Sequence, residues 1–147
     1  ENLYGIGIYS TDSATILYNI LLRNSEYGVF LDDDSNRNKI HHNDFIDNNE
    51  NGTEYGESQG YDDGYGNEWF DADAEEGNYW SNHRGSDDYL IDGKAESTDS
   101  YPFGEPLVYT PTDGVSLNIL FLPIALLLLA RFIHRSKSRK TKCRNHL

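Results

Sequence analysis

Carboxylates are the most abundant side chains in this sequence that could do chemistry. The chain holds 25 Asp and Glu residues against 12 Lys and Arg residues, and its formal net charge is −13. Paired carboxylates act as acid and base in glycoside cleavage, and carboxylates also ligate calcium. On so acidic a chain, however, pairs of acids arise by chance, and no Asp or Glu stands out by its spacing. We therefore assign no catalytic residue.

Alternating carboxylates provide the candidate calcium ligands. Asp71, Asp73 and Glu75 occupy every second position, as in the first part of an EF-hand loop. The glycine of such a loop falls one position late here, at Gly77, and no spaced Glu completes the ligand set. Acidic turns also keep an external surface hydrated without a bound ion. Calcium and simple hydration are both open readings, and no other cofactor is expected.

Three histidines, His41, His42 and His83, are the other metal ligands of the acidic part. Cu(I) prefers Met and Cys, and the acidic part has neither. On one strand His41 and His42 would point to opposite faces and would not share an ion, whereas a turn would bring them together. The sequon Asn51-Gly-Thr53 is consistent with an external location.

A repeat of about 24 residues must position these side chains. The pairs that it relates are Ile16 and Ile40, Asn19 and Asn43, Leu21 and Phe45, and Asn24 and Asn48. Short strands divided by Gly and Asn at this period are typical of a solenoid, in which equivalent residues stack about 4.8 Å apart. The L-x-x-L-x-L pattern of a leucine-rich repeat is absent. We therefore predict an all-β fold, a parallel β-helix, with coils over residues 1–70.

Asparagine recurs at one point of each repeat, at Asn19, Asn43 and Asn67. Asn tolerates the left-handed backbone of a turn, and its amide can hydrogen-bond to the Asn of the next coil. We predict a structural ladder of these three residues. The same register places Trp69 one repeat after Phe45.

An aromatic and acidic segment, residues 71–106, follows the coils and is expected to cap the strand edges and core of the last one. Trp69, Tyr79 and Trp80 have two interpretations. They form a hydrophobic lid over the last coil, or they present a platform on which sugar rings stack. We favour the lid, because large aromatic side chains are usually buried.

An apolar run over residues 115–133 predicts one transmembrane α-helix. At 1.5 Å per residue it spans about 28 Å, close to the roughly 30 Å hydrocarbon core of a bilayer. Residues 1–114 hold 25 acidic and five basic residues, a formal charge of −20, whereas residues 115–147 hold seven basic residues and no acid. Basic flanks stay cytoplasmic. We therefore expect a single-pass protein of the cell membrane with an extracellular N-terminal part, a linker at 107–114 and a cytoplasmic tail at 134–147.

The chain contains no Met and begins without a signal peptide, so we expect it to be the C-terminal end of a longer protein. Its one cysteine, Cys143, lies in the basic tail, so no disulfide links the acidic part. That tail is typical of a stop-transfer signal, and we expect no nucleic-acid partner.

The pattern N-x-I-x-x-N-x-F-x-x-N over residues 38–48 resembles the repeats of NosD-like right-handed β-helix proteins. The segments GNYWS at 77–81 and DSYP at 99–102 are similar in order to the closing segment of such surface proteins. The resemblance covers residues 4–106 and implies a right-handed coil, and the family name suggests copper. Relatives often carry a longer Asp- and Gly-rich loop where residues 85–93 stand here, so a cation site of that loop is not carried over.

Three functions are compatible with these features, and fold alone does not decide among them. The first, which we favour, is a non-enzymatic, membrane-anchored surface scaffold for adhesion or carbohydrate binding, with a polysaccharide or cell-envelope glycan as partner. The second is a carbohydrate-active enzyme, a polysaccharide lyase or hydrolase, whose catalytic coils lie upstream. The third is a copper-accessory protein of the NosD type.

Overall fold

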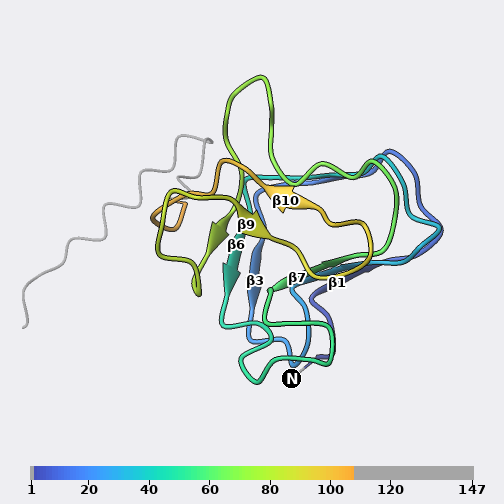
Figure 1. The fold of residues 1–147 in the computed structure, drawn as a ribbon, viewed down its shortest axis with the longest axis horizontal. Coiled ribbons are helices and arrows are strands. Elements are labelled where there is room, and N and C mark those ends of the chain that lie inside the picture. Colours follow the sequence, from blue (N-terminus) through green and yellow to red (C-terminus); the bar gives the residue numbers. More distant parts are fainter. Residues whose placement is uncertain (1, 108–147) are drawn as a thin grey trace, which may run out of the picture. The chain divides into compact units, whose positions relative to one another are not determined.

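The computed structural model describes residues 2–107 (Figure 1). This part consists of ten short strands and contains no helix, so the predicted all-β class is confirmed for it. Within it, no helical segment reaches the length and apolarity that a membrane crossing needs. The predicted transmembrane helix at 115–133, the tail at 134–147 and residues 108–114 of the linker lie outside the described residues.

Three parallel sheets are built from successive passes of the chain (Figure 1). The first contains β1 (Ile6–Ile8), β4 (Val29–Leu31) and β7 (Gly60–Asp62). The second contains β2 (Thr15–Ile16) and β5 (Lys39–Ile40). The third contains β3 (Ile20–Leu22), β6 (Asp44–Ile46) and β8 (Tyr79–Trp80). Each of the first two passes gives one strand to each sheet, an arrangement compatible with a parallel β-helix.

Equivalent residues of the first two passes lie directly beside one another. Ile16 pairs with Ile40 and Leu21 with Phe45, each 24 residues apart. Their side chains enter a common core, because alternate residues of a strand point to opposite faces. The buried hydrophobic residues of this core are Ile16, Leu21, Val29, Leu31, Ile40, Phe45, Trp69, Trp80, Tyr89 and Ile91.

The third pass is longer than the repeat predicts. Val29 pairs with Gly60, 31 residues later, and Phe45 pairs with Trp80, 35 residues later. Two added loops, residues 49–58 and 70–77, account for the extra length. Trp69, which follows the bridge between Lys39 and Glu68, is therefore the counterpart of Ile40, and the predicted match of Trp69 to Phe45 is wrong. Parallel pairing also continues past residue 70, to the bridge of Tyr79 with Phe103.

An antiparallel pair, β9 (Tyr89–Leu90) and β10 (Thr98–Asp99), closes this end. The ring of Trp80 stacks between two neighbours, with centroid distances of 4.0 Å to Phe45 and 4.0 Å to Tyr89. This aromatic column continues the core from the coils into the closing segment.

Candidate functional site

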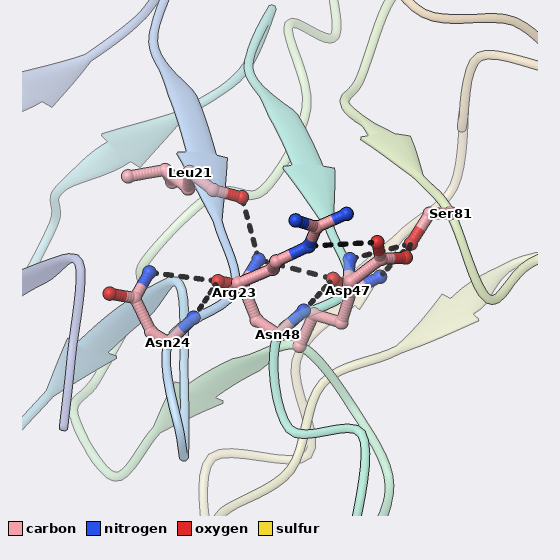
Figure 2. Close-up of polar contacts among 7 residues, drawn as sticks. Leu21, Arg23, Asn24, Asp47, Asn48 and Ser81 are labelled. Carbon is pink, nitrogen blue, oxygen red and sulfur yellow. Dashed lines mark hydrogen bonds and ion pairs between the residues drawn. The ribbon is translucent and has the colours of Figure 1, made fainter. Parts of the chain in front are cut away.

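One corner of the coils, directly after β3 and β6, brings polar groups together. Arg23 and Asp47 occupy equivalent positions there, with φ of 51° and 53°, so the chain turns in the left-handed conformation. Their side chains form an ion pair, with 3.6 Å between Arg23 Nε and Asp47 Oδ2. In the third pass, the Ser81 hydroxyl oxygen accepts a hydrogen bond from the backbone N–H of Asp47 at 2.9 Å. Figure 2 shows these contacts.

Four amide side chains form a continuous hydrogen-bonded base beside this ion pair. Asn24 donates to the amide oxygen of Asn48 at 2.8 Å, and Asn48 donates to that of Gln59 at 3.1 Å. Gln59 in turn donates to Asn82 at 2.9 Å. Asn48 also donates to the backbone carbonyl of Leu21, as Figure 2 shows. Because each amide after Asn24 both accepts and donates, the series links neighbouring passes of the chain at this corner.

A groove with a volume of about 580 Å³ lies at this corner. Its lining consists of amides, carboxylates, one hydroxyl and one glycine, namely Asp47, Asn48, Asn49, Glu50, Asn51, Gly52, Glu57, Gln59, Ser81 and Asn82. Glu50 and Glu57 are exposed, whereas Asp47 is half-buried. Among the described residues that line the groove, none is basic or aromatic. Such a surface suits a hydrophilic ligand rich in hydrogen-bond donors.

Asn49, one of the lining residues, carries a buried acceptor without a partner. Its side-chain N–H2 donates to the carbonyls of Gly56 and Ser58, at 3.2 and 2.9 Å. Its amide oxygen is the one buried side-chain polar atom without a partner among residues 2–107. Exchanging the amide oxygen and nitrogen would not help, because the oxygen would then face two carbonyl oxygens. An unpaired buried acceptor costs about 1–3 kcal/mol, so Asn49 is destabilising unless a donor reaches it.

The predicted asparagine ladder exists in part. Asn19 donates to the amide oxygen of Asn43 at 3.0 Å, but Asn43 donates to that of Asn78, also at 3.0 Å. Asn67 instead accepts from Asn38 at 3.1 Å, so including Asn67 in the ladder of Asn19 and Asn43 is wrong. The loop at 70–77 moves the next equivalent residue eleven positions along.

The spacing N-x-W could have identified Asn78 as the residue that continues the ladder after Asn43. Asn67 and Asn78 each stand two residues before a tryptophan, Trp69 or Trp80. The 24-residue period reaches Asn67 first, and the second occurrence, Asn78, is the one that stacks on Asn43. Sequence reasoning also missed Gln59, which continues the ladder from Asn48 although it lies only eleven residues later.

The tryptophans are internal. Trp69 and Trp80 are both fully buried, so their ring faces are closed to a sugar, and the alternative of glycan stacking on them is wrong. Their indole N–H groups donate to buried carboxylates, Trp69 to Asp62 at 3.0 Å and Trp80 to Asp99 at 2.9 Å. Burial raises the pKa of Asp99 above its ordinary value, and the hydrogen bonds that it accepts oppose that rise. Tyr79, the third residue of that set, is half-buried.

His41 and His42 meet because they lie in a turn. His42 has a φ of 56°, and the two Nδ1 atoms are 2.6 Å apart. His42 Nε2 lies 2.7 Å from Glu76 Oε2, so a neutral His42 donates there and its Nδ1 accepts from His41. Burial, followed by the neighbouring His42, lowers the pKa of His41.

The calcium candidates are not gathered into a site. Asp71 Oδ1 accepts hydrogen bonds from the backbone N–H groups of Asp73 and Ala74, which closes a turn. Glu75 takes a left-handed backbone conformation at φ 57°. Across residues 2–107, no group of three or more His, Cys, Asp or Glu side chains is placed to hold a metal ion.

Comparison with known families matches the coils directly. The model of the family described as "Periplasmic copper-binding protein (NosD)" matches residues 1–85. The chain belongs to the NosD family. No curated protein and no solved structure matches the chain.

Copper, which the family description implies, fits the described residues only incompletely. Imidazole suits copper, and the His41 and His42 Nδ1 atoms are close enough to contact one ion after a small rotation. Neither Met nor Cys occurs in residues 2–107, and no third ligand joins the pair. Within residues 2–107 of this NosD-family chain, the donor set therefore falls short of a resident copper site.

Proposed function

We propose that this protein is a surface scaffold, a right-handed parallel β-helix that binds carbohydrate in the polar groove at its corner. The observation that carries the proposal is the groove itself, with about 580 Å³ of space and a lining of amide, carboxylate and hydroxyl groups. Binding pockets for small ligands commonly measure about 300–1,000 Å³. Planar amides and carboxylates pair with neighbouring hydroxyl groups, which a sugar ring supplies in series.

Stacked coils can hold the groups of a binding groove in fixed positions. The wall of the groove comes from two passes of the chain, because Asp47 and Asn48 follow β6 whereas Ser81 and Asn82 follow β8. The amide series through Asn48 and Gln59 fixes these passes relative to each other. A ligand therefore meets groups whose positions are already set, which lowers the entropic cost of binding.

Glycan-array binding, followed by calorimetric titration with the full 147-residue chain, tests the proposal. We expect Asn82→Ala to weaken binding of the selected glycan, since Asn82 lies in the groove and is exposed. Asp73→Asn, in the exposed loop away from the groove lining, is the matched control and should leave affinity unchanged. Glycan binding that is insensitive to Asn82→Ala would contradict the groove, and release of reducing ends would instead favour the enzyme.

We further propose that residues 115–133 anchor the coils at the outer face of the membrane, with residues 134–147 in the cytoplasm. The charge difference between residues 1–114 and 115–147 supports this orientation. Cys143 is the only cysteine of the chain and reports on it. A membrane-impermeant maleimide should label Cys143 only after the cells are permeabilised, and labelling of intact cells would contradict the orientation.

Copper delivery is the second candidate, and the His41–His42 pair favours it. Two imidazole nitrogens 2.6 Å apart in a turn offer a two-ligand contact for copper as a cargo. Titration with Cu(I) and Cu(II) should show binding that His41→Ala removes and that His83→Ala leaves intact. Equal loss in both variants, or no binding, would eliminate this candidate.

A further inference from the structure

The groove at the corner has an acidic lining, and Arg23 beside it is engaged in an ion pair. Three carboxylates line it, those of Asp47, Glu50 and Glu57, and none of its lining residues is basic. Arg23 approaches only through its ion pair with Asp47. An anionic polysaccharide would therefore be repelled, whereas a cationic ligand would be attracted.

Most amide donors of the groove are already engaged within the protein. Of the five amide side chains that line it, four donate to a protein oxygen, namely those of Asn48, Asn49, Gln59 and Asn82. Apart from the amide of Asn51, what the groove can still offer is acceptors, the carboxylates of Asp47, Glu50 and Glu57. A ligand that brings donors in excess of acceptors is complementary to this set, and an ammonium group has three donors and no acceptor.

A metal ion would satisfy the same charges, but the geometry does not suit one. No group of three or more acidic, His or Cys side chains in residues 2–107 is placed to hold a metal. The carboxylates of Asp47, Glu50 and Glu57 therefore do not converge on one point. This distribution fits several separated positive charges better than one compact divalent ion.

On this basis, and resting on the proposed carbohydrate function, we propose that the groove selects glycans with free amino groups. The ligand class is an oligosaccharide of unacetylated hexosamine units. Each ring supplies hydroxyl groups to the amide-lined wall, and its protonated amine faces Asp47, Glu50 or Glu57. Acetylation of the amine removes the charge and leaves one donor and one acceptor, so it discriminates strongly between otherwise identical chains.

Calorimetric titration of the full chain with four probes tests this selection: glucosamine tetramer, N-acetylglucosamine tetramer, galacturonate tetramer and spermine. We expect the glucosamine tetramer to bind most tightly, with an affinity that falls as salt is added. Glu57→Gln should weaken it by up to about fivefold, the size of one exposed ion pair, without affecting the acetylated tetramer. Asp73→Asn changes charge by the same amount outside the groove and should have no effect.

The outcomes separate this inference from the proposed function. If the acetylated tetramer binds as well and Glu57→Gln changes nothing, amine selection is wrong and carbohydrate binding stands. If spermine binds as tightly as the glucosamine tetramer, the groove recognises charge alone and the sugar class is wrong. If neither those two tetramers nor any glycan of the array binds, both proposals fail.

Discussion

The first two coils (residues 5–48) and the closing segment (residues 49–107) share one core but treat its polar groups differently. In the coils, side-chain amides pass hydrogen bonds from one pass to the next, as from Asn19 to Asn43. In the closing segment, the ladder of Asn78 ends on the carboxylate of Asp99, and that of Asn67 ends on Asp62. An amide donates and accepts, whereas an ionised carboxylate only accepts, so it terminates a ladder.

The comparison shows how a repetitive fold is brought to an end. Each terminating carboxylate also accepts an indole N–H, so a tryptophan stands where the preceding coil has Ile40 or Phe45. The third ladder, from Asn24 through Asn48 to Gln59, lacks such a terminator and ends on Asn82 in the groove. The two terminated ladders are structural, and the unterminated one leads to the candidate site.

Truncating one core side chain in the closing segment and one in the coils should lower the free energy of unfolding most. Trp80→Ala removes the ring that stacks on both Phe45 and Tyr89, and we expect a loss of about 3–5 kcal/mol of unfolding free energy. Leu21→Ala, in the first coil, should cost near the lower end of about 2–5 kcal/mol, because only one neighbouring coil covers it. Urea unfolding measures both values. A larger loss for Leu21→Ala would show that the closing segment does not hold the core.

Removing Asp99, the carboxylate that ends a ladder, should lower the free energy of unfolding somewhat less than removing Trp80. Asp99→Ala leaves the indole N–H of Trp80 and the backbone N–H of Asn78 without their acceptor, and we expect a loss of about 2–4 kcal/mol. Asp99→Asn keeps an oxygen in the same place and should lose less than half as much. Equal losses in the two variants, again by urea unfolding, would mean that the charge rather than the acceptor matters.

One part of the pH dependence of stability should come from Asp99, the carboxylate that ends the ladder of Asn78, and none from the amides of the ladders. Burial raises the folded-state pKa of Asp99 above the 3.8 of the unfolded chain, so the folded protein binds a proton more tightly. The contribution of Asp99 to stability therefore increases as pH falls from its raised pKa to 3.8 and is constant below. Asp99→Asn should remove this part of the pH profile, whereas Asn43→Ala should lower stability equally at all these pH values. An unchanged profile in Asp99→Asn would contradict the assignment.

The difference between the coils and the closing segment also explains which parts of the fold could be predicted from the sequence. Ile16, Ile40, Leu21 and Phe45 were predictable as stacked pairs because nothing interrupts the 24-residue period between them. Beyond Asn48 the period fails, since loops grow outward at corners without disturbing the sheets. The groove was not predictable for the same reason, because it joins residues after β6 to residues after β8 across those loops.

The smallest expected effect tests whether surface charge contributes to the coils at all. Arg23 and Asp47 form an ion pair at the surface, with side-chain exposures of 71% and 36%, and such pairs contribute about 0–1 kcal/mol. Arg23→Gln should thus lower the unfolding free energy by less than about 1 kcal/mol at low salt, and not at all at 1 M salt, where the Debye length is about 3 Å. Arg37→Gln is the matched control, because Arg37 is also exposed in a left-handed turn but forms no ion pair among the described residues. An equal loss in both variants would assign the effect to the net charge of −20 on residues 1–114 rather than to the pair.

A loss that persists in 1 M salt would mean that Arg23 acts through packing against the corner. In that case the rigidity of the groove would depend on the coils as well as on the closing segment.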